Sequence, residues 1–152
     1  MNMNQTPILL FLDFDGVLHP LHSPVDKQLE KIFFFESTIR QYPNINIVIS
    51  SSWRHNYTMD ELLAYFAVDI QRRIIDSTRH VEVSKAKNRY DEILDYLKHT
   101  NQLQSLWIAI DDSKKEFPEN LSNVVFCKPN VGFNEESANA LKEIIKHMTP
   151  SP

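Results

Sequence analysis

Apolar residues in this chain gather in short continuous runs that are separated by more polar segments. Near-continuous apolar runs of this kind are typical of parallel β-strands that are covered on both faces. The predicted strands are ILLFL (8–12), INIVIS (45–50), LWIAI (106–110) and VVFC (124–127), with a weaker strand, RIIDS, at 73–77.

Helical patterns occupy the segments between these strands. Thr58 and Glu61 have the spacing of a capping box, and Asn134 precedes two glutamates that suit the first turn of a helix. The predicted helices cover residues 25–42, 58–66, 88–100 and a last segment that starts near Asn134. This alternation predicts one α/β domain over residues 1–152, a three-layer, Rossmann-like parallel sheet with helices on both faces and a frayed tail at 148–152.

Composition narrows the class of protein without identifying it. The 152 residues are 42% hydrophobic and 24% charged, and their net charge of −4 argues against a basic protein that coats nucleic acid. The single cysteine, Cys127, excludes an internal disulfide and a cysteine-based metal site. No apolar run approaches the ~20 residues that span a bilayer, and the first residues lack a signal-peptide pattern. We therefore expect a cytoplasmic protein with no membrane partner.

Polar side chains follow three of the predicted strands. Asp13 and Asp15 come after the first, Ser50–Arg54 after the second, and Asp111 and Asp112 after the run at 106–110. Because ligands bind beyond the carboxyl ends of parallel strands, we expect these groups to converge at one edge of the sheet. Each group alone is equally consistent with a turn or a helix cap.

The four carboxylates together favour a metal site. Two like charges 4 Å apart repel by roughly 4 kcal/mol at an effective dielectric constant of 20, so a protein seldom keeps such a group unless a cation offsets it. Oxygen ligands without a histidine or cysteine cluster favour Mg²⁺. The turn at Gly16, one of only two glycines in the chain, would let the two aspartates before it act differently. One carboxylate could attack a phosphoryl group while the other lies near the leaving group.

Three segments resemble motifs of the haloacid dehalogenase-like (HAD) hydrolases. FLDFDGVLH is similar to their motif I, IVISSSW to motif II and WIAIDD to motif IV, and the match spans residues 8–112. The resemblance implies the HAD-like fold and phosphatase chemistry with Mg²⁺, through an aspartyl-phosphate intermediate. A looser set, which includes Arg89–Ile93, is similar to small HAD domains of multidomain RNA-repair proteins.

The resemblance also assigns roles to the four aspartates. Asp13 matches the nucleophile and a metal ligand. Asp15 matches the general acid and base, with its backbone carbonyl on the metal. Asp112, as the last acid of the strand end, is the preferred further metal ligand, and Asp111 would bind through water or orient a neighbour.

Candidates for binding the phosphoryl group come from motifs II and III. Ser51 is the favoured hydroxyl, Ser50 is the second choice, and Ser52 is a further substrate-binding candidate. The basic residue of motif III is expected to be Arg89, with Lys87 next and Lys85 as a third candidate. A guanidinium suits phosphate at least as well as the ammonium group that is commoner at this position.

Several residues near these motifs have two interpretations. Trp53 could stack on a base or anchor the core, and Arg54 is expected to contact substrate just past the strand end. Residues 72–89 carry six basic and two acidic side chains, which suits an anionic substrate or a solvated helix face. His19 lies in a loop where HAD proteins place a mobile flap, and it is either a substrate contact or idle.

Little of the chain is left over for a cap domain, so we expect an open site and a bulky or polymeric phosphate. A nucleotide or a nucleic-acid end is the expected partner. The leading function is a Mg²⁺-dependent phosphomonoester hydrolase. Phosphotransfer to an acceptor other than water, a receiver-like signalling domain and a non-catalytic binding domain remain as alternatives. A receiver would carry its phosphorylated aspartate on a middle strand, where this chain has serines.

Overall fold

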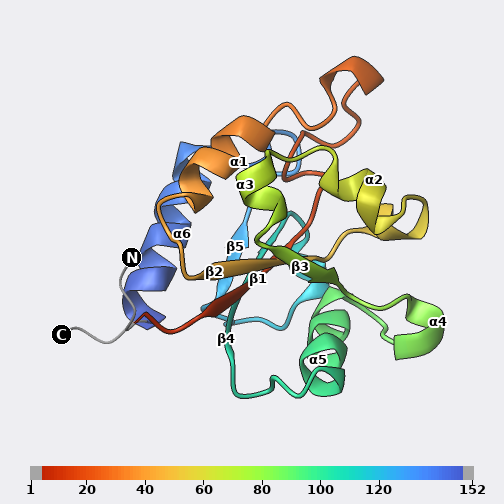
Figure 1. Ribbon diagram of the computed structural model, residues 1–152, viewed down its shortest axis with the longest axis vertical. Coiled ribbons are helices and arrows are strands. Elements are labelled where there is room, and N and C mark those ends of the chain that lie inside the picture. The colour runs from red at the N-terminus through yellow and green to blue at the C-terminus, as the bar shows by residue number, and fades with distance from the viewer. Residues whose placement is uncertain (1–4, 149–152) are drawn as a thin grey trace.

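The computed structural model describes residues 5–148 and contains one all-parallel sheet (Figure 1). Its strand order is β3-β2-β1-β4-β5, so β1 is central. The strands are β1 (Ile8–Leu12), β2 (Ile45–Ile49), β3 (Ile74–Ser77), β4 (Leu106–Asp111) and β5 (Val124–Phe126). All five predicted strands are therefore present, with ends that differ by at most one residue.

Helices alternate with these strands along the chain. The α-helices are α1 (Ile32–Ile39), α2 (Met59–Leu63), α3 (Val68–Gln71), α4 (Val81–Ser84), α5 (Arg89–His99) and α6 (Glu135–Met148). Three short 3₁₀ turns are η1 (Val25–Lys27), η2 (Ser52–His55) and η3 (Lys114–Glu116). The predicted capping box of α2 is present, because Thr58 accepts the Glu61 N–H and Glu61 accepts the Thr58 N–H.

The two faces of the sheet are covered by different helices, as the fold prediction requires. Ile8, Leu10 and Leu12 of β1 belong to a core cluster with α1, α2, α3 and α6. Leu9 and Phe11 belong to a second cluster with α5. Figure 1 shows α1, α3 and α6 on one side of the sheet and α5 on the other. Because every β1 side chain is buried, the strand is apolar at every position rather than at alternate ones.

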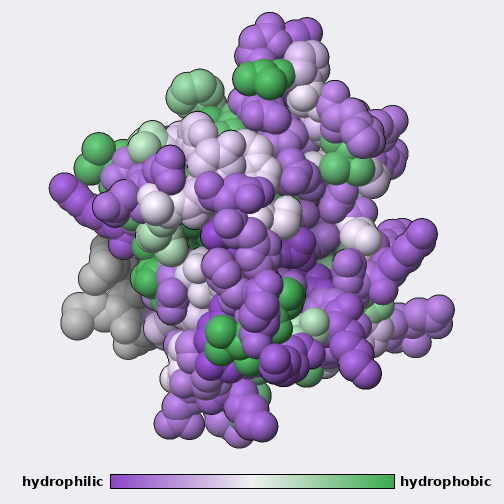
Figure 2. Space-filling view, turned by 90° about the vertical axis from the view of Figure 1, so that its right-hand side faces the viewer, coloured by the Kyte–Doolittle hydropathy of each residue, from purple (hydrophilic) through white to green (hydrophobic). Residues whose placement is uncertain are grey.

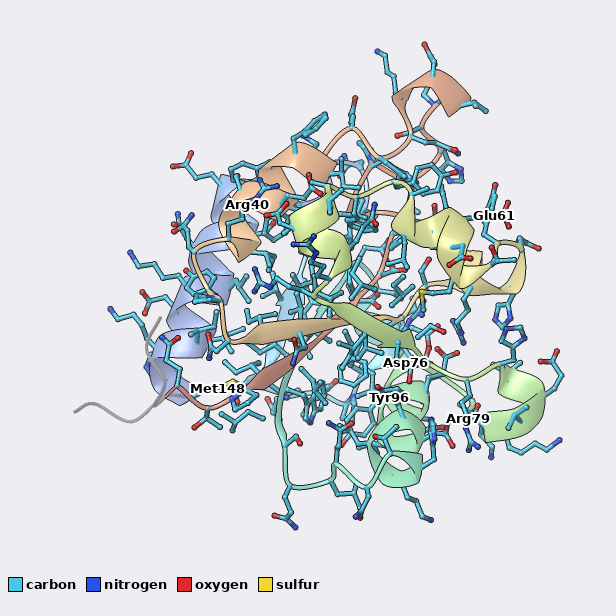
Figure 3. The ribbon with its side chains drawn as sticks, in the orientation of Figure 1. Arg40, Glu61, Asp76, Arg79, Tyr96 and Met148 are labelled. Carbon is cyan, nitrogen blue, oxygen red and sulfur yellow. The ribbon has the colours of Figure 1, made fainter. Side chains whose placement is uncertain are left out.

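The helix α5 is joined to β3 by polar contacts as well as apolar ones. Figure 3 shows Asp76 and Tyr96 close together between these elements. Burial raises the pKa of Tyr96 to about 12, and the hydrogen bond with Asp76 acts in the same direction. Arg79 forms an ion pair with Asp95 of α5 at 2.5 Å.

The surface that carries α2 and α4 is mostly hydrophilic (Figure 2).

The prediction of one helix over residues 25–42 is wrong. The segment holds η1 and the eight-residue α1, and between them Leu29 has a left-handed φ of 64°. Leu29 is buried, and its N–H donates to Nδ1 of His19 instead of to a helical carbonyl. Lys31 donates its N–H to the carbonyl of Leu18. Contacts with the loop after β1 therefore outweigh local helix propensity in this segment.

The last helix, α6, extends to the end of the described residues. The helix α6 includes Met148, the first residue of the predicted frayed tail, and the remainder of that tail lies outside the described residues. Asn134 caps α6, because its side-chain oxygen accepts the Ser137 N–H at 3.0 Å.

No helix within residues 5–148 is long and apolar enough to cross a membrane.

Candidate active site

The carboxyl ends of β1, β2 and β4 meet at one edge of the sheet. Leu12 is in register with Ile49 of β2 and with Ile110 of β4. The N–H of Asp13 donates to the carbonyl of Ile110 at 3.1 Å, and the N–H of Ser50 donates to that of Leu12 at 2.8 Å. Strand pairing therefore continues into the first polar residue, which fixes where these side chains leave the sheet. The predicted convergence of the three motifs is confirmed.

Asp13, Asp111 and Asp112 form a compact acidic cluster at this edge. A carboxylate oxygen from each lies within 4.8 Å of those from the other two. Burial and the neighbouring Asp111 raise the pKa of Asp13 well above its ordinary value, and burial raises the pKa of Asp111 to about 6. Arg89 acts in the opposite direction on both groups, but burial outweighs it, so the ionised carboxylates are unfavourable unless a further cation lies among them. The cluster therefore fits a hard divalent cation with oxygen ligands.

The two acids that end β4 differ in how they are held. One oxygen of Asp111 accepts the N–H groups of Asp112 and Ser113, at 2.9 and 3.0 Å, and the other lies 3.3 Å from Nε of Arg89. The Asp112 carboxylate is half-buried and accepts no hydrogen bond from residues 5–148. Asp112 is therefore free to face a cation directly, whereas Asp111 is already oriented by protein groups.

Gly16 is required by the packing of the acidic cluster. Its φ is 76°, in the left-handed region that favours glycine, and a Cβ atom placed on it would lie 2.2 Å from Oδ2 of Asp112. The turn after Asp15 thus packs its backbone directly against the Asp112 carboxylate. Any side chain at residue 16 would displace that carboxylate.

Asp15 lies outside the acidic cluster and is held by two N–H donors. Its Oδ1 lies 2.8 Å from Nε2 of His19 and accepts Nε1–H of Trp53 at 3.1 Å. The hydrogen bond with His19, and then that with Trp53, lower the pKa of Asp15. Its side chain is 42% exposed. The second carboxylate oxygen, Oδ2, takes no part in these two bonds, so it can serve proton transfer.

Arg89, the favoured basic residue of motif III, lies against the acidic cluster. Its guanidinium is 3.6 Å from Oδ1 of Asp13 and 3.3 Å from Oδ2 of Asp111, and it donates to the carbonyl of Ser50. It is the first residue of α5, whose start is fixed by the Asn88 side chain, which accepts the Asp91 N–H. Its neighbours Lys85 and Lys87 are exposed and form no ion pair with a carboxylate of residues 5–148.

Arg54 points inward rather than towards solvent, unlike the expected substrate contact. It is 6% exposed, donates to the carbonyls of Ser51 and Arg79, and lies 3.2 Å from Glu92. Glu92 also lies 3.5 Å from Arg89. Arg54 therefore supports Arg89 through a shared carboxylate, and its contact with a substrate stays a prediction.

The three serines after β2 have different surroundings. Ser51 is fully buried, and its side-chain oxygen accepts the Trp53 N–H at 3.2 Å, which caps η2. Ser50 is also buried, and its hydroxyl lies 3.5 Å from Nη1 of Arg89. Ser52 is exposed. The capping bond leaves the Ser51 hydroxyl proton available, so both buried serines remain candidates for contacting a phosphoryl group.

The basic segment 72–89 does not form one surface. The Arg73 guanidinium donates to the carbonyls of Ile39 and Ile45, at the amino edge of the sheet. Arg79 is paired with Asp95. Of its six basic residues, Arg89 is the one that contacts the acidic cluster. The net charge of this segment is therefore a poor guide to the substrate site.

Two residues of the site were missed or misjudged from the sequence. His19 is 2% exposed and bonded at both ring nitrogens, so it is not an idle, exposed loop histidine. Glu92 was missed, and it links Arg54 to Arg89. It lies three residues after Arg89 on one helix face, a spacing from which the Arg89–Glu92 contact could have been predicted. Trp53 packs edge-on against Phe14 as well as donating to Asp15, so it has both a core and a site contact.

This parallel α/β fold, with an acidic cluster at the ends of β1 and β4, is that of a HAD-like domain. Residues 9–138 match the model of a family described as the HAD domain in Swiss Army Knife RNA repair proteins. The match covers most of the chain, and the protein belongs to this family. It is therefore a HAD-type hydrolase in general terms, with an acidic site that fits a metal ion. Neither a comparison with curated proteins nor one with solved structures gave a match.

Proposed function

We propose that this protein is a Mg²⁺-dependent phosphomonoester hydrolase that works through an aspartyl-phosphate on Asp13. The observation that carries the proposal is the position of Asp13. Its carboxylate shares the acidic cluster with Asp111 and Asp112 and lies 3.6 Å from the Arg89 guanidinium. A carboxylate in contact with both a cation-binding cluster and a guanidinium is suited to attack an anionic phosphoryl group, because both partners reduce the charge repulsion.

The residues that would hold Mg²⁺ are Asp13, Asp111 and Asp112, together with the backbone carbonyl of Asp15. When bound, the ion supplies charge neutralisation at the phosphoryl oxygens. The buried carboxylates with raised pKa values support this assignment, because a divalent cation stabilises their ionised form.

The chemistry proceeds in two steps on the two aspartates of motif I. An Asp13 oxygen forms a bond to phosphorus while the bond from phosphorus to the leaving oxygen breaks. Asp15, whose neutral form is favoured once the anionic phosphate lies beside it, gives that oxygen a proton. Asp15 then removes a proton from water, which attacks phosphorus, releases phosphate and restores the Asp13 carboxylate. His19 and Trp53 hold Oδ1 of Asp15 in one orientation throughout, so the free Oδ2 is the oxygen that carries the proton.

The substrate is proposed to be a nucleotide or a nucleic-acid end. The family is described by its occurrence in RNA repair proteins, which supports a substrate of this class. The half-exposed Asp15 carboxylate supports an open site that can accept a polymer end.

Phosphate release from an aryl phosphate tests the proposed function. We expect turnover that requires Mg²⁺, stops with a chelator and is lost in Asp13→Asn. Asp60→Asn, at an exposed aspartate in the first turn of α2, is the matched control and should keep full turnover. Turnover without a divalent metal, or in Asp13→Asn, would contradict the proposal.

A further inference from the structure

A cavity of about 720 Å³ opens beside Asp112, on the β4–β5 side of the acidic cluster. Its walls come from the segments that follow three strands and from the first turn of α6. They include Leu21 after β1, Ser113–Lys115 after β4, Cys127–Pro129 after β5 and Glu136 of α6. The Leu21 N–H donates to the carbonyl of Pro129 at 2.8 Å, which closes one wall. The cavity is therefore continuous with the proposed reaction site.

Three lysines line this cavity, which we call the β4–β5 groove. Lys114, Lys115 and Lys128 are exposed, and none forms an ion pair with a carboxylate among residues 5–148. The acids on its walls are Asp112 and Glu136. Since Asp112 belongs to the acidic cluster, the remaining side chains of the groove have a positive net charge once a cation neutralises that cluster. Unpaired lysines around a cavity indicate an anionic ligand.

An aromatic ring forms part of the same groove. Phe126 ends β5 and is half-buried, and its ring packs edge-on against Phe117 with centroids 5.6 Å apart. Nζ of Lys114 lies over the Phe126 ring, 5.9 Å from its centre, so a base that stacks on this face would displace the ammonium group towards the phosphates. A half-exposed ring beside lysines is the combination that binds a base together with its phosphate backbone.

We propose that the β4–β5 groove binds the leaving-group side of the substrate, with Lys114, Lys115 and Lys128 on phosphates beyond the reacting one and Phe126 under a base. The ligand is a single-stranded nucleic-acid end. The position of the reacting phosphate in this proposal rests on the proposed function. Binding in the groove does not require turnover, so the two can be tested apart.

Binding of a fluorescent, 5′-phosphorylated single-stranded oligonucleotide tests the groove. Fluorescence anisotropy is measured with Mg²⁺ in an Asp13→Asn background, which prevents turnover. The test variant combines Lys114→Gln, Lys115→Gln and Lys128→Gln. The matched control combines Lys98→Gln, Lys142→Gln and Lys146→Gln, which remove the same charge from the last turn of α5 and from α6.

We expect the groove variant to bind the oligonucleotide at least tenfold more weakly than the control variant. The slope of log K against log salt should become shallower by about 0.7 for each phosphate contact that is lost. An equal loss in both variants overturns the proposal, because it would reflect net charge alone. An unchanged affinity in the groove variant also overturns it.

A second variant and a second ligand test the base contact. Phe126→Leu should weaken oligonucleotide binding by roughly fivefold or more if a base stacks on the ring. A nucleoside triphosphate serves as a competing ligand. If it binds in the groove while the oligonucleotide does not, the assignment of a nucleic-acid end is wrong. Failure of wild-type protein to hydrolyse an aryl phosphate would remove the proposed function and leave the binding result standing.

Discussion

Nε2 of His19 lies 2.8 Å from Oδ1 of Asp15, while Nδ1 of the same ring accepts the N–H of Leu29 at 3.1 Å. Because Nδ1 is an acceptor, the ring proton is on Nε2 and points at Asp15. The left-handed Leu29, which interrupts the helix expected at this point, supplies the N–H that fixes this tautomer. A loop backbone group thus orients the proposed acid and base through a buried histidine.

This relationship predicts different effects for two His19 variants. His19→Leu removes the N–H donor to Asp15, and a hydrogen bond to a charged group contributes about 1.5–3 kcal/mol. We expect kcat for phosphate release to fall by about 10- to 100-fold, with little change in KM. His19→Gln also loses the acceptor for Leu29, but its amide N–H can still reach Asp15, so it should recover part of kcat. Equal rates for the two variants would contradict a positioning role.

Arg89 should be essential both for turnover and for the stability of the metal-free protein. Arg89→Gln leaves Asp13, Asp111 and Glu92 without their shared cation, and breaking a buried ion pair costs about 3–5 kcal/mol. We expect the free energy of unfolding in urea to fall by an amount in this range. Lys87→Gln, at an exposed neighbour, should leave both quantities unchanged. Equal turnover and equal unfolding free energies in Arg89→Gln and Lys87→Gln would contradict the role given to Arg89.

Divalent metal should stabilise the fold through the acidic cluster. At a Mg²⁺ concentration about 100 times its dissociation constant, binding adds about 2.7 kcal/mol to the free energy of unfolding. For a domain of this size, the midpoint of thermal unfolding should rise by about 5–10 °C. A chelator should reverse the rise, and Asp112→Asn should reduce it while Asp60→Asn preserves it. If Mg²⁺ raised the unfolding midpoint equally in Asp112→Asn and Asp60→Asn, the ion would bind outside the acidic cluster.

The two glycines allow a test of how the turn shapes the metal site. Gly16→Ala brings a Cβ atom into the Asp112 carboxylate, whereas Gly132→Ala brings one to 2.9 Å from the carbonyl of Val17. Both have positive φ, 76° and 84°, so both variants should lower the temperature of unfolding. We expect Mg²⁺ affinity, measured by calorimetry, to fall in Gly16→Ala and to be retained in Gly132→Ala. Unchanged Mg²⁺ affinity in Gly16→Ala would show that packing of residue 16 against Asp112 does not shape the metal site.

Much of the fold and the acidic site was predictable because they depend on patterns local in sequence. Buried parallel strands require apolar residues at every position, so β1 and β2 stand out as runs. A parallel sheet brings the residues after those runs to one edge, so the sequence alone predicts that Asp13 lies near Asp111. The scarcity of glycine was also informative, because both glycines occupy backbone conformations that disfavour other residues.

The features that were not predictable depend on contacts between segments far apart in sequence. The helix over 25–42 failed because Leu29 is turned by the loop that contains His19. The inward position of Arg54 was also not predictable, because its ion pair with Glu92 joins the segment after β2 to α5. Neither pairing has a sequence spacing that marks it. The β4–β5 groove likewise combines lysines from two separate loops.

Trapping the covalent intermediate tests the central claim most directly. Protein turning over an aryl phosphate with Mg²⁺ is quenched with borohydride, which reduces an aspartyl-phosphate to homoserine, and its peptides are sequenced by mass spectrometry. The account predicts homoserine at position 13, not at position 15, and none in Asp13→Asn or in the presence of a chelator. Steady turnover without reduction at position 13, or with reduction at another aspartate, would contradict it.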